Sequence, residues 1–173
     1  MENFQKILVP VDFEPASDEA VEQGRAVKAG EHFIEFSAAS LRAVATAASV
    51  ARGSKGKLVL LHVTPPLHST TMYTGPVSLP VGIIDEIEGK AKATSLAALQ
   101  HLKSAVCSGI TVEFAVGPGQ PAQAVLDEAE RLGADLLVMA ASGRSRVARF
   151  FVGSTADRII RESPCPVLVI PAK

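Results

Sequence analysis

The amino-acid sequence predicts an α/β protein with an open parallel sheet of five strands. Five short runs are rich in Val, Ile and Leu, which is typical of strands buried on both faces. Segments with a helical spacing of apolar residues separate these runs, as in a parallel sheet with helices on both faces. The chain has 173 residues, of which 47% are hydrophobic and 20% charged, so we expect one domain with a sizeable core.

The expected strands follow one another along the chain with helices between them. They cover residues 6–12, 57–64, 110–116, 135–141 and 166–171. Right-handed crossovers restrict the topology, and a chain that runs outward over three strands before it returns to the other side of the first has the order 3-2-1-4-5. In such a Rossmann-like sheet, ligands bind at the carboxyl ends of the strands that flank the switch point.

The expected helices are marked by residues typical of helix ends. Ser37 begins a helix over residues 37–52 that stops at Gly53, and Pro121 begins one over 121–132 that stops at Gly133. The other two cover residues 83–106 and 154–162. The expected core positions are Leu41, Val44, Ala45 and Ala48 in the helix over 37–52, and Ile84, Ile87, Ala91, Leu96, Leu99 and Leu102 in the helix over 83–106.

Two connections, residues 14–36 and 65–82, are longer than the ~2–6 residues usual between such elements. Both emerge at carboxyl ends of strands, and two interpretations stay open for each: a lid over the ligand site or a surface loop. Within the first, Ser17 can cap a short helix over residues 17–28. We expect residues 14–36 to lie outside the sheet and its four helices, so that their deletion leaves the fold intact.

The charge balance excludes some classes of protein. Lys and Arg number 17 and Asp and Glu 18, which gives a formal net charge of −1. A domain that wraps DNA or RNA carries a basic excess, and an anionic membrane surface attracts one, so we expect neither partner. The chain shows no secretory signal and no run of ~20 apolar residues. Cys107 and Cys165 suit free thiols, and we expect a cytoplasmic protein.

The predicted switch point nominates a ligand site. It lies between the first and fourth strands, whose carboxyl ends are Val11-Asp12 and Met139-Ala140. A carboxylate at such a place can accept hydrogen bonds from a ribose hydroxyl or hold a metal ion. Alternatively, Asp12 simply caps the turn that follows it.

A loop rich in hydroxyl groups, glycine and arginine follows the fourth strand. It contains Ala140, Ala141, Ser142, Gly143, Arg144, Ser145 and Arg146, and later Arg149, Gly153, Ser154 and Thr155, with Arg158 and Arg161 beyond. The glycines permit positive φ and close approach of the backbone, and amides at a helix start bind anions. The sequence therefore favours a phosphate site here. Alternatively, Ser154 and Asp157 form a capping box that satisfies the helix end without a ligand.

Other motifs carry little chemistry. No Walker P-loop occurs, and the G-x-G-x-x-A run at residues 117–122 is better explained as a turn before a helix, because Pro118 and Pro121 lack amides. The histidines have no metal-ligand spacing, and His62 is expected to be a satisfied core residue. Ser142 and Ser145 have no His/Asp arrangement beside them. We expect neither a catalytic residue nor a metal-ligand cluster.

Several segments form an ordered and specific set. They are KILVPVDF at 6–13, SAASLRAVATAASVA at 37–51, LVLLHV at 58–63, GADLLVMAASG at 133–143, Gly153-Ser154, and CPVLVIP at 165–171. The set resembles the universal stress protein family over nearly the whole chain apart from residues 14–36. The resemblance implies an adenine nucleotide alpha hydrolase-like fold, one domain over 1–173 with an insertion at 14–36, and a homodimer through the last strand, from Pro166 to Pro171.

Family members that bind ATP carry G-x-x-G, nine residues and then G-[ST]. This chain has Ala140 in place of the first glycine, then Gly143, nine residues and Gly153-Ser154. The methyl group of Ala140 is tolerable if its φ is negative and obstructive if φ must be positive. The resemblance also implies a nucleotide site. At the strand ends it places Pro10, Val11 and Asp12 on the first strand, Val63 at the adenine, and Met139 and Ala140 at the ribose and phosphates. Along the triphosphate it places Ser142, Gly143, Arg144 and Ser145, and at the helix start Gly153, Ser154 and Thr155.

Two functions follow from the resemblance. The first is a stress-response protein that binds ATP, with or without Mg²⁺, and whose conformation or choice of partner depends on the nucleotide, with slow hydrolysis at most. The second is a dimeric interaction module with a degenerate, empty site.

Overall fold

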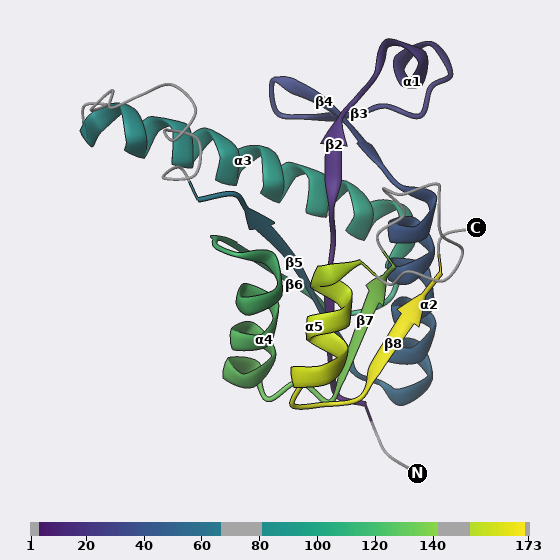
Figure 1. Ribbon diagram of the computed structural model, residues 1–173. Coiled ribbons are helices and arrows are strands. Elements are labelled where there is room, and N and C mark those ends of the chain that lie inside the picture. Colours follow the sequence, from purple (N-terminus) through teal and green to yellow (C-terminus); the bar gives the residue numbers. More distant parts are fainter. Residues whose placement is uncertain (1–3, 67–80, 142–152, 172–173) are drawn as a thin grey trace.

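The computed structural model describes residues 4–66, 81–141 and 153–171. Its main body has three layers, with a five-stranded sheet between two pairs of helices (Figure 1). The strands are β1 (Lys6–Pro10), β5 (Lys57–Thr64), β6 (Val112–Pro118), β7 (Leu136–Ala140) and β8 (Val167–Ile170). They are parallel and lie in the order β6-β5-β1-β7-β8. The predicted order 3-2-1-4-5 is therefore confirmed.

Side chains that alternate along the strands build a core on each face of the sheet. On one face Val9 and Leu60 pack against α2 (Ala38–Ser54) and α3 (Val81–Val106). On the other face Leu8 and Leu61 pack against α4 (Pro121–Leu132) and α5 (Ser154–Glu162). Each strand is apolar on both faces because each face is covered by helices.

The strand ends differ slightly from prediction. β1 stops at Pro10 instead of residue 12, and β6 begins and ends two residues later than expected. β7 and β8 are each shorter by one residue at both ends. Both bounds of α4 and α5 are as predicted, and Gly133 ends α4 with a positive φ of 57°.

The helix α2 begins where predicted but ends two residues later. Ser37 caps it by accepting a hydrogen bond from the amide of Ser40. Its last turn closes at Lys55, which adopts φ 55°, and not at Gly53. The glycine that the turn requires is Gly56, because a Cβ there would lie 2.2 Å from the carbonyl oxygen of Phe4. A side chain at that position would collide with the backbone that leads into β1.

Half of the core positions predicted for α2 are wrong. Val44 and Ala48 are buried, but Leu41 and Ala45 are exposed. The helix instead presents its smallest side chains to the sheet, and this buried face consists of Ala39, Ser40, Ala43, Val44, Ala47, Ala48 and Ala51. Small residues four apart let the helix axis approach the sheet closely, so the face with the larger Leu41 is not the buried one.

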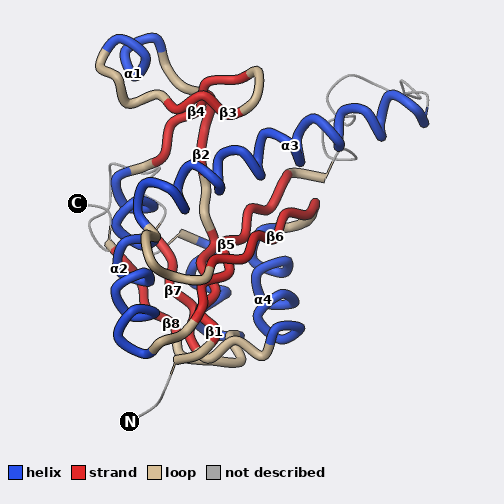
Figure 2. The backbone as a smooth tube through the Cα atoms, turned by 180° about the vertical axis from the view of Figure 1, so that it is seen from behind, coloured by secondary structure: helices blue, strands red, loops and turns tan. Residues whose placement is uncertain are grey.

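The helix α3 is buried only in its second half. Leu99 and Leu102 are fully buried, whereas Ile87, also predicted as core, is 39% exposed. The 26-residue helix runs beyond the sheet at its amino end (Figures 1 and 2), so its apolar stripe has no sheet to cover there. Within the described part of the chain, no helix is both long and apolar enough for a membrane crossing.

The segment over 14–36 is folded and is not an unstructured surface loop. With Phe13 it forms a three-stranded antiparallel sheet in the order β2-β4-β3. Its elements are β2 (Phe13–Pro15), α1 (Asp18–Glu22), β3 (Val27–Ala29) and β4 (His32–Phe36). Ser17 caps α1 as predicted, through the amide of Ala20, but this helix ends at Glu22, well before residue 28.

This small sheet stands over the carboxyl end of β1 and packs against α3 (Figure 1). It lies outside the five-stranded sheet, as expected. However, Ala29, Ile34 and Phe36 are buried in the same apolar cluster as Leu99 of α3. Because these residues complete one side of the core, we expect their deletion to destabilise the fold, contrary to the sequence-based prediction that the fold stays intact. Residues 67–80, which make up most of the second long connection over 65–82, lie outside the described residues.

Candidate functional site

The five-stranded sheet opens between β1 and β7 at its carboxyl edge. The pairing of these strands runs from Ile7 with Leu136 to Leu8 with Leu137. Beyond this point β1 stays with β5, and the amide of Val11 donates to the carbonyl oxygen of Leu61 at 2.8 Å. β7 meanwhile stays with β8 as far as Ala140. The opening therefore lies at the topological switch point, where ligands bind in folds of this kind.

The strand-end residues predicted for the site lie along this edge. Val11 and Met139 are buried, Pro10 and Ala140 are half-buried, and Asp12 is exposed. Val63 is half-buried on β5, the strand on the other side of β1. Three neighbouring strands thus bring these side chains to one end of the sheet.

The backbone at Ala140 accepts a side chain without strain. Among the described residues other than glycine, only Lys55 has a positive φ, so Ala140 adopts the negative φ of an ordinary strand residue. The replacement of a glycine by Ala140 therefore costs no backbone strain here.

The helix α5 begins without a side-chain cap. Its N-cap residue is Gly153, with φ −56° and ψ 157°, and no side-chain hydrogen bond caps this end in the described part of the chain. The alternative of a capping box formed by Ser154 and Asp157 is wrong, because the N-cap residue is Gly153 and Ser154 already lies in the helix. Asp157 instead pairs with Arg161, one turn further on, at 2.6 Å. Gly153 does not have a positive φ, so this position does not require glycine for its backbone conformation. The absence of a side chain there instead allows a ligand to approach the backbone closely.

The first turn of α5 is thus suited to an anion. Since α5 leads from the carboxyl end of β7 to the amino end of β8, its amino end lies at the carboxyl edge of the sheet (Figure 1). Its first amides have no partner within the helix, and the helix dipole favours negative charge there. Ser154 is exposed and Thr155 half-buried at this end.

The predicted arginine cluster is only partly visible. Arg158 donates to Glu162 at 3.0 Å and also contacts Gln123 of α4, and Arg161 pairs with Asp157. These two arginines are engaged along α5. Six further predicted residues lie outside the described residues: Ser142, Gly143, Arg144, Ser145, Arg146 and Arg149.

His62, near the carboxyl end of β5, contacts the chain just beyond β1, on both sides of Asp12. It is 7% exposed, so the prediction of a satisfied core residue is confirmed. Its Nδ1 lies 2.9 Å from the carbonyl oxygen of Val11, and its ring stacks on Phe13 with centroids 4.1 Å apart. Burial lowers the pKa of His62, while the hydrogen bond to Val11 and the charge of Asp12 oppose that shift. The sequence could not reveal these contacts, because their partners are about fifty residues away.

The turn at residues 117–122 behaves as predicted. Pro118 ends β6 and Pro121 begins α4, while the amide of Gly119 donates to the carbonyl oxygen of Thr64 at 3.0 Å. That amide is committed to the fold and does not face a ligand.

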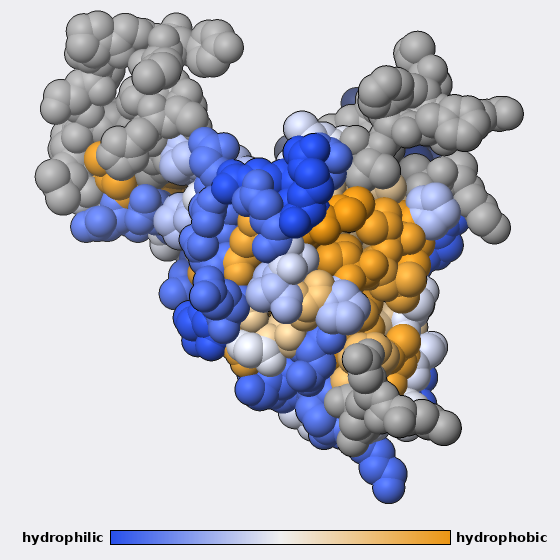
Figure 3. Space-filling model, turned by 60° about the horizontal axis from the view of Figure 1, so that its bottom comes forward, coloured by the Kyte–Doolittle hydropathy of each residue, from blue (hydrophilic) through white to orange (hydrophobic). Residues whose placement is uncertain are grey.

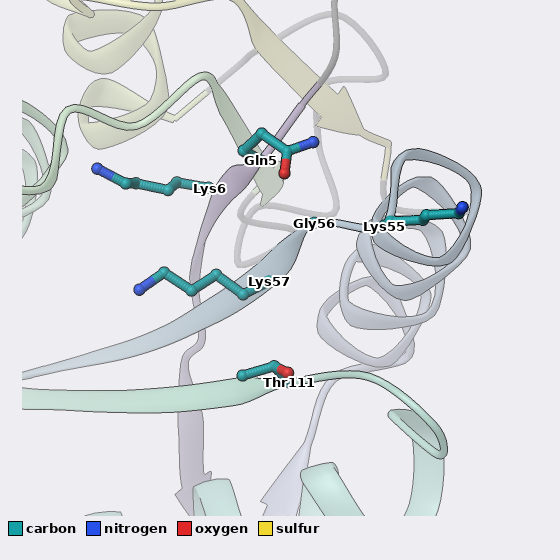
Figure 4. A pocket seen from close by; sticks show the side chains of 6 residues that line it. All are labelled: Gln5, Lys6, Lys55, Gly56, Lys57 and Thr111. Atoms are coloured by element: carbon teal, nitrogen blue, oxygen red, sulfur yellow. The ribbon is translucent and has the colours of Figure 1, made fainter.

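A hollow of about 320 Å³ lies at the opposite, amino edge of the sheet (Figure 4). It is lined by Gln5, Lys6, Lys55, Gly56, Lys57 and Thr111. Two of its ammonium groups are already bound, because Lys6 donates to the carbonyl oxygen of Leu132 at 2.9 Å and Lys57 pairs with Glu113 at 2.7 Å. This hollow is separate from the opening at the switch point.

Comparison with known proteins gives one consistent result. A sequence profile of the universal stress protein family matches residues 33–171. Universal stress protein YxiE of Bacillus subtilis is 31% identical over 139 residues, which are 79% of this chain and 94% of that protein. The solved structure of hypothetical protein MJ0577 matches with a TM-score of 0.71 at 20% identity and covers 99% of both chains.

Some of the similar structures contain a nucleotide. A universal stress protein family protein of Arabidopsis thaliana has AMP bound; its TM-score is 0.59 at 20% identity, over 98% of this chain and 92% of that one. The universal stress protein of Archaeoglobus fulgidus is in complex with dAMP; its TM-score is 0.53 at 22% identity, over 98% and 99% of the chains. A third is in complex with cAMP. At these identities the likeness establishes a common fold.

Proposed function

The chain belongs to the universal stress protein family, and on that premise we propose that it binds an adenine nucleotide at the opening between β1 and β7. The observation that carries the proposal is the uncapped start of α5 at Gly153, at the carboxyl edge of the sheet. The AMP, dAMP and cAMP held by proteins of the same fold support an adenine nucleotide as the ligand.

Each part of the nucleotide has a suitable partner at the opening. The first amides of α5, from Ser154 and Thr155, would receive a phosphate group. Asp12 would accept a hydrogen bond from a ribose hydroxyl, and the backbone of Val63 would meet the adenine. The remaining proposed residues are Pro10, Val11, Met139 and Ala140 at the strand ends, Gly153 at the helix start, and Ser142, Gly143, Arg144 and Ser145 outside the described residues.

We take the nucleotide to be ATP, with Mg²⁺ as its counterion. Bound ATP supplies a triphosphate whose charge the helix start and Arg144 would neutralise. Occupancy would set the conformation of the protein or its choice of partner under stress, with slow hydrolysis at most. The negative φ of Ala140 favours this reading over an empty, degenerate site, because the one departure from the ATP-binding motif leaves the backbone unstrained.

The edge strand β8 supports a homodimer formed through residues 166–171, from Pro166 to Pro171. β8 pairs with β7 on one side, and its other edge has no partner among the described residues. Leu168 on β8 and Leu41 on α2 are exposed. Apolar side chains gather on the right of the molecule in Figure 3, the side on which β8 and α2 lie in Figure 1. Pairing of two β8 edges would cover such a surface.

We propose that residues 1–173 form one universal stress protein domain with an insertion at 14–36. The family profile itself covers residues 33–171. The free thiols of Cys107 and Cys165 favour a reducing compartment, and we propose the cytoplasm.

Calorimetric titration of Gly153→Val with MgATP tests the site. Val is compatible with the backbone at Gly153, since φ is −56°, so the change acts through the side chain that it places at the helix start. We expect at least a tenfold loss of affinity. Gly89→Val on α3 is the matched control, because Gly89 is exposed with no heavy atom within 4 Å of an added Cβ. Equal affinity in wild type and Gly153→Val would refute the site.

A further inference from the structure

His62 contacts the residues on both sides of Asp12. Its Nδ1 lies 2.9 Å from the carbonyl oxygen of Val11, which precedes Asp12. Its ring stacks on Phe13, which follows Asp12, with centroids 4.1 Å apart and an interplanar angle of 19°. One buried side chain therefore fixes the backbone before and after the proposed ribose-binding carboxylate.

The hydrogen bond to Val11 determines the tautomer of His62. A carbonyl oxygen can only accept, so Nδ1 of His62 carries the proton and donates it. The bond is buried, because His62 is 7% and Val11 4% exposed. A side chain without a donor at this point would leave the buried carbonyl oxygen of Val11 without this partner. That loss would destabilise the present backbone conformation at Val11.

The stack on Phe13 is supported from its other side. The ring of Phe36, on β4 of the small sheet, meets Phe13 edge to face with centroids 5.8 Å apart. Ser40 of α2 in turn donates to the carbonyl oxygen of Asp12 at 3.4 Å. The backbone around Asp12 is thus held by β5, by α2 and by the small sheet together.

We infer that His62 is a positioning residue of the nucleotide site, which orients Asp12 toward a ribose hydroxyl by holding Val11 and Phe13. This inference rests on the proposed binding of an adenine nucleotide. It assigns His62 no contact with the nucleotide. Its role is to fix the direction in which the carboxylate of Asp12 leaves the end of β1.

The test is the preference of the protein for AMP over its deoxy analogues. Calorimetry gives the affinities of wild type, His62→Phe and Asp12→Ala for AMP, 2′-deoxy-AMP and 3′-deoxy-AMP. A hydrogen bond from a ribose hydroxyl to a carboxylate is worth about tenfold or more in affinity, so wild type should prefer AMP over one analogue by about that factor. We expect Asp12→Ala to lose this preference for AMP. His62→Phe, which keeps an aromatic ring, should also lose the preference, while its affinity for the disfavoured deoxy analogue stays within about threefold of wild type.

Two further variants separate positioning from general damage. Asn at position 62 retains a donor near the place of Nδ1, so His62→Asn should recover part of the preference and also serves if His62→Phe does not fold. His101→Phe, at an exposed histidine of α3, should behave as wild type.

The outcomes distinguish the two proposals. A preference retained in both His62 variants, or absent from wild type that binds AMP, overturns the role of His62 and leaves nucleotide binding intact. Wild type that binds neither AMP nor MgATP at millimolar concentration overturns the proposed function and this inference with it. If wild type binds MgATP and not AMP, the same comparison is made with 2′-deoxy-ATP and 3′-deoxy-ATP, and a preference retained in both His62 variants again overturns the role of His62.

Discussion

Single residues decide where the backbone can turn and where it can approach another segment closely. Gly56 and Gly53 are three positions apart at the end of α2, yet their surroundings differ. An added Cβ at Gly56 would lie 2.2 Å from the carbonyl oxygen of Phe4, whereas at Gly53 it would meet no heavy atom within 4 Å. The sequence predicted that Gly53 ends α2, but the helix ends at Ser54. The close approach to Phe4 requires glycine at Gly56. The sequence does not reveal this requirement, because the contact with Phe4 is tertiary.

The two glycines predict opposite effects on stability. Gly56→Ala should lower the free energy of unfolding by about 1–3 kcal/mol, since the backbone must shift to admit the methyl group. Gly53→Ala should raise it by about 0.5–1 kcal/mol, because Gly53 lies within a helix with open space around it. Urea unfolding of both variants measures the difference, and similar values for the two would contradict the contact at Phe4.

Burial of His62 predicts a dependence of stability on pH. Because its pKa is below 6.5 in the folded protein, the unfolded chain binds more protons as the pH falls through 6.5. The contribution of neutral His62 to stability is therefore complete above pH 6.5 and is lost below it, down to the pKa of the folded state. Urea unfolding at several pH values measures this dependence. As the pH falls below 6.5, the free energy of unfolding should decrease less in His62→Phe than in wild type and in the control His101→Phe. Equal slopes in all three would show that His62 is not the group responsible.

At the scale of elements, strands and helices of the main body were predictable and the small sheet was not. The five central strands are recognisable in the sequence because both of their faces are apolar. The ends of α4 are marked by Pro121 and Gly133. Two strands of the small sheet have three residues each, too few for alternation to be recognised. The positions of β1 and β7 nominated the ligand site, but the contacts of His62 depend on chain segments that meet only after folding.

Two neighbouring phenylalanines on β4 measure how much the small sheet contributes to the core. Phe36 is 7% exposed and packs with Phe13, so Phe36→Ala should cost about 3–5 kcal/mol of unfolding free energy. Phe33 is 51% exposed and the same change there should cost about 0.5 kcal/mol or less. Deletion of residues 14–36 should expose α3 and lower the melting temperature further than Phe36→Ala. A deletion variant that melts like wild type would show that this sheet is an independent appendage.

For the whole molecule, the proposed homodimer can be tested at the exposed edge. A charge at Leu168 would be buried if two β8 strands pair, so Leu168→Asp should yield monomers in analytical ultracentrifugation where wild type yields dimers. Ile87→Asp, which alters an equally exposed apolar residue on α3, should leave the dimer unchanged. Wild-type protein that sediments as a monomer at micromolar concentration would contradict the dimer.

The proposed nucleotide site is the opening between β1 and β7, where the strand ends and the start of α5 meet one edge of the sheet. Calorimetric titration of the wild-type protein with MgATP, beside MgGTP, tests whether a nucleotide binds there. We predict a saturable heat with one site per chain for MgATP and a weaker affinity for MgGTP, since the proposed contacts include the adenine. The absence of any heat with MgATP at millimolar concentration would contradict nucleotide binding by this protein.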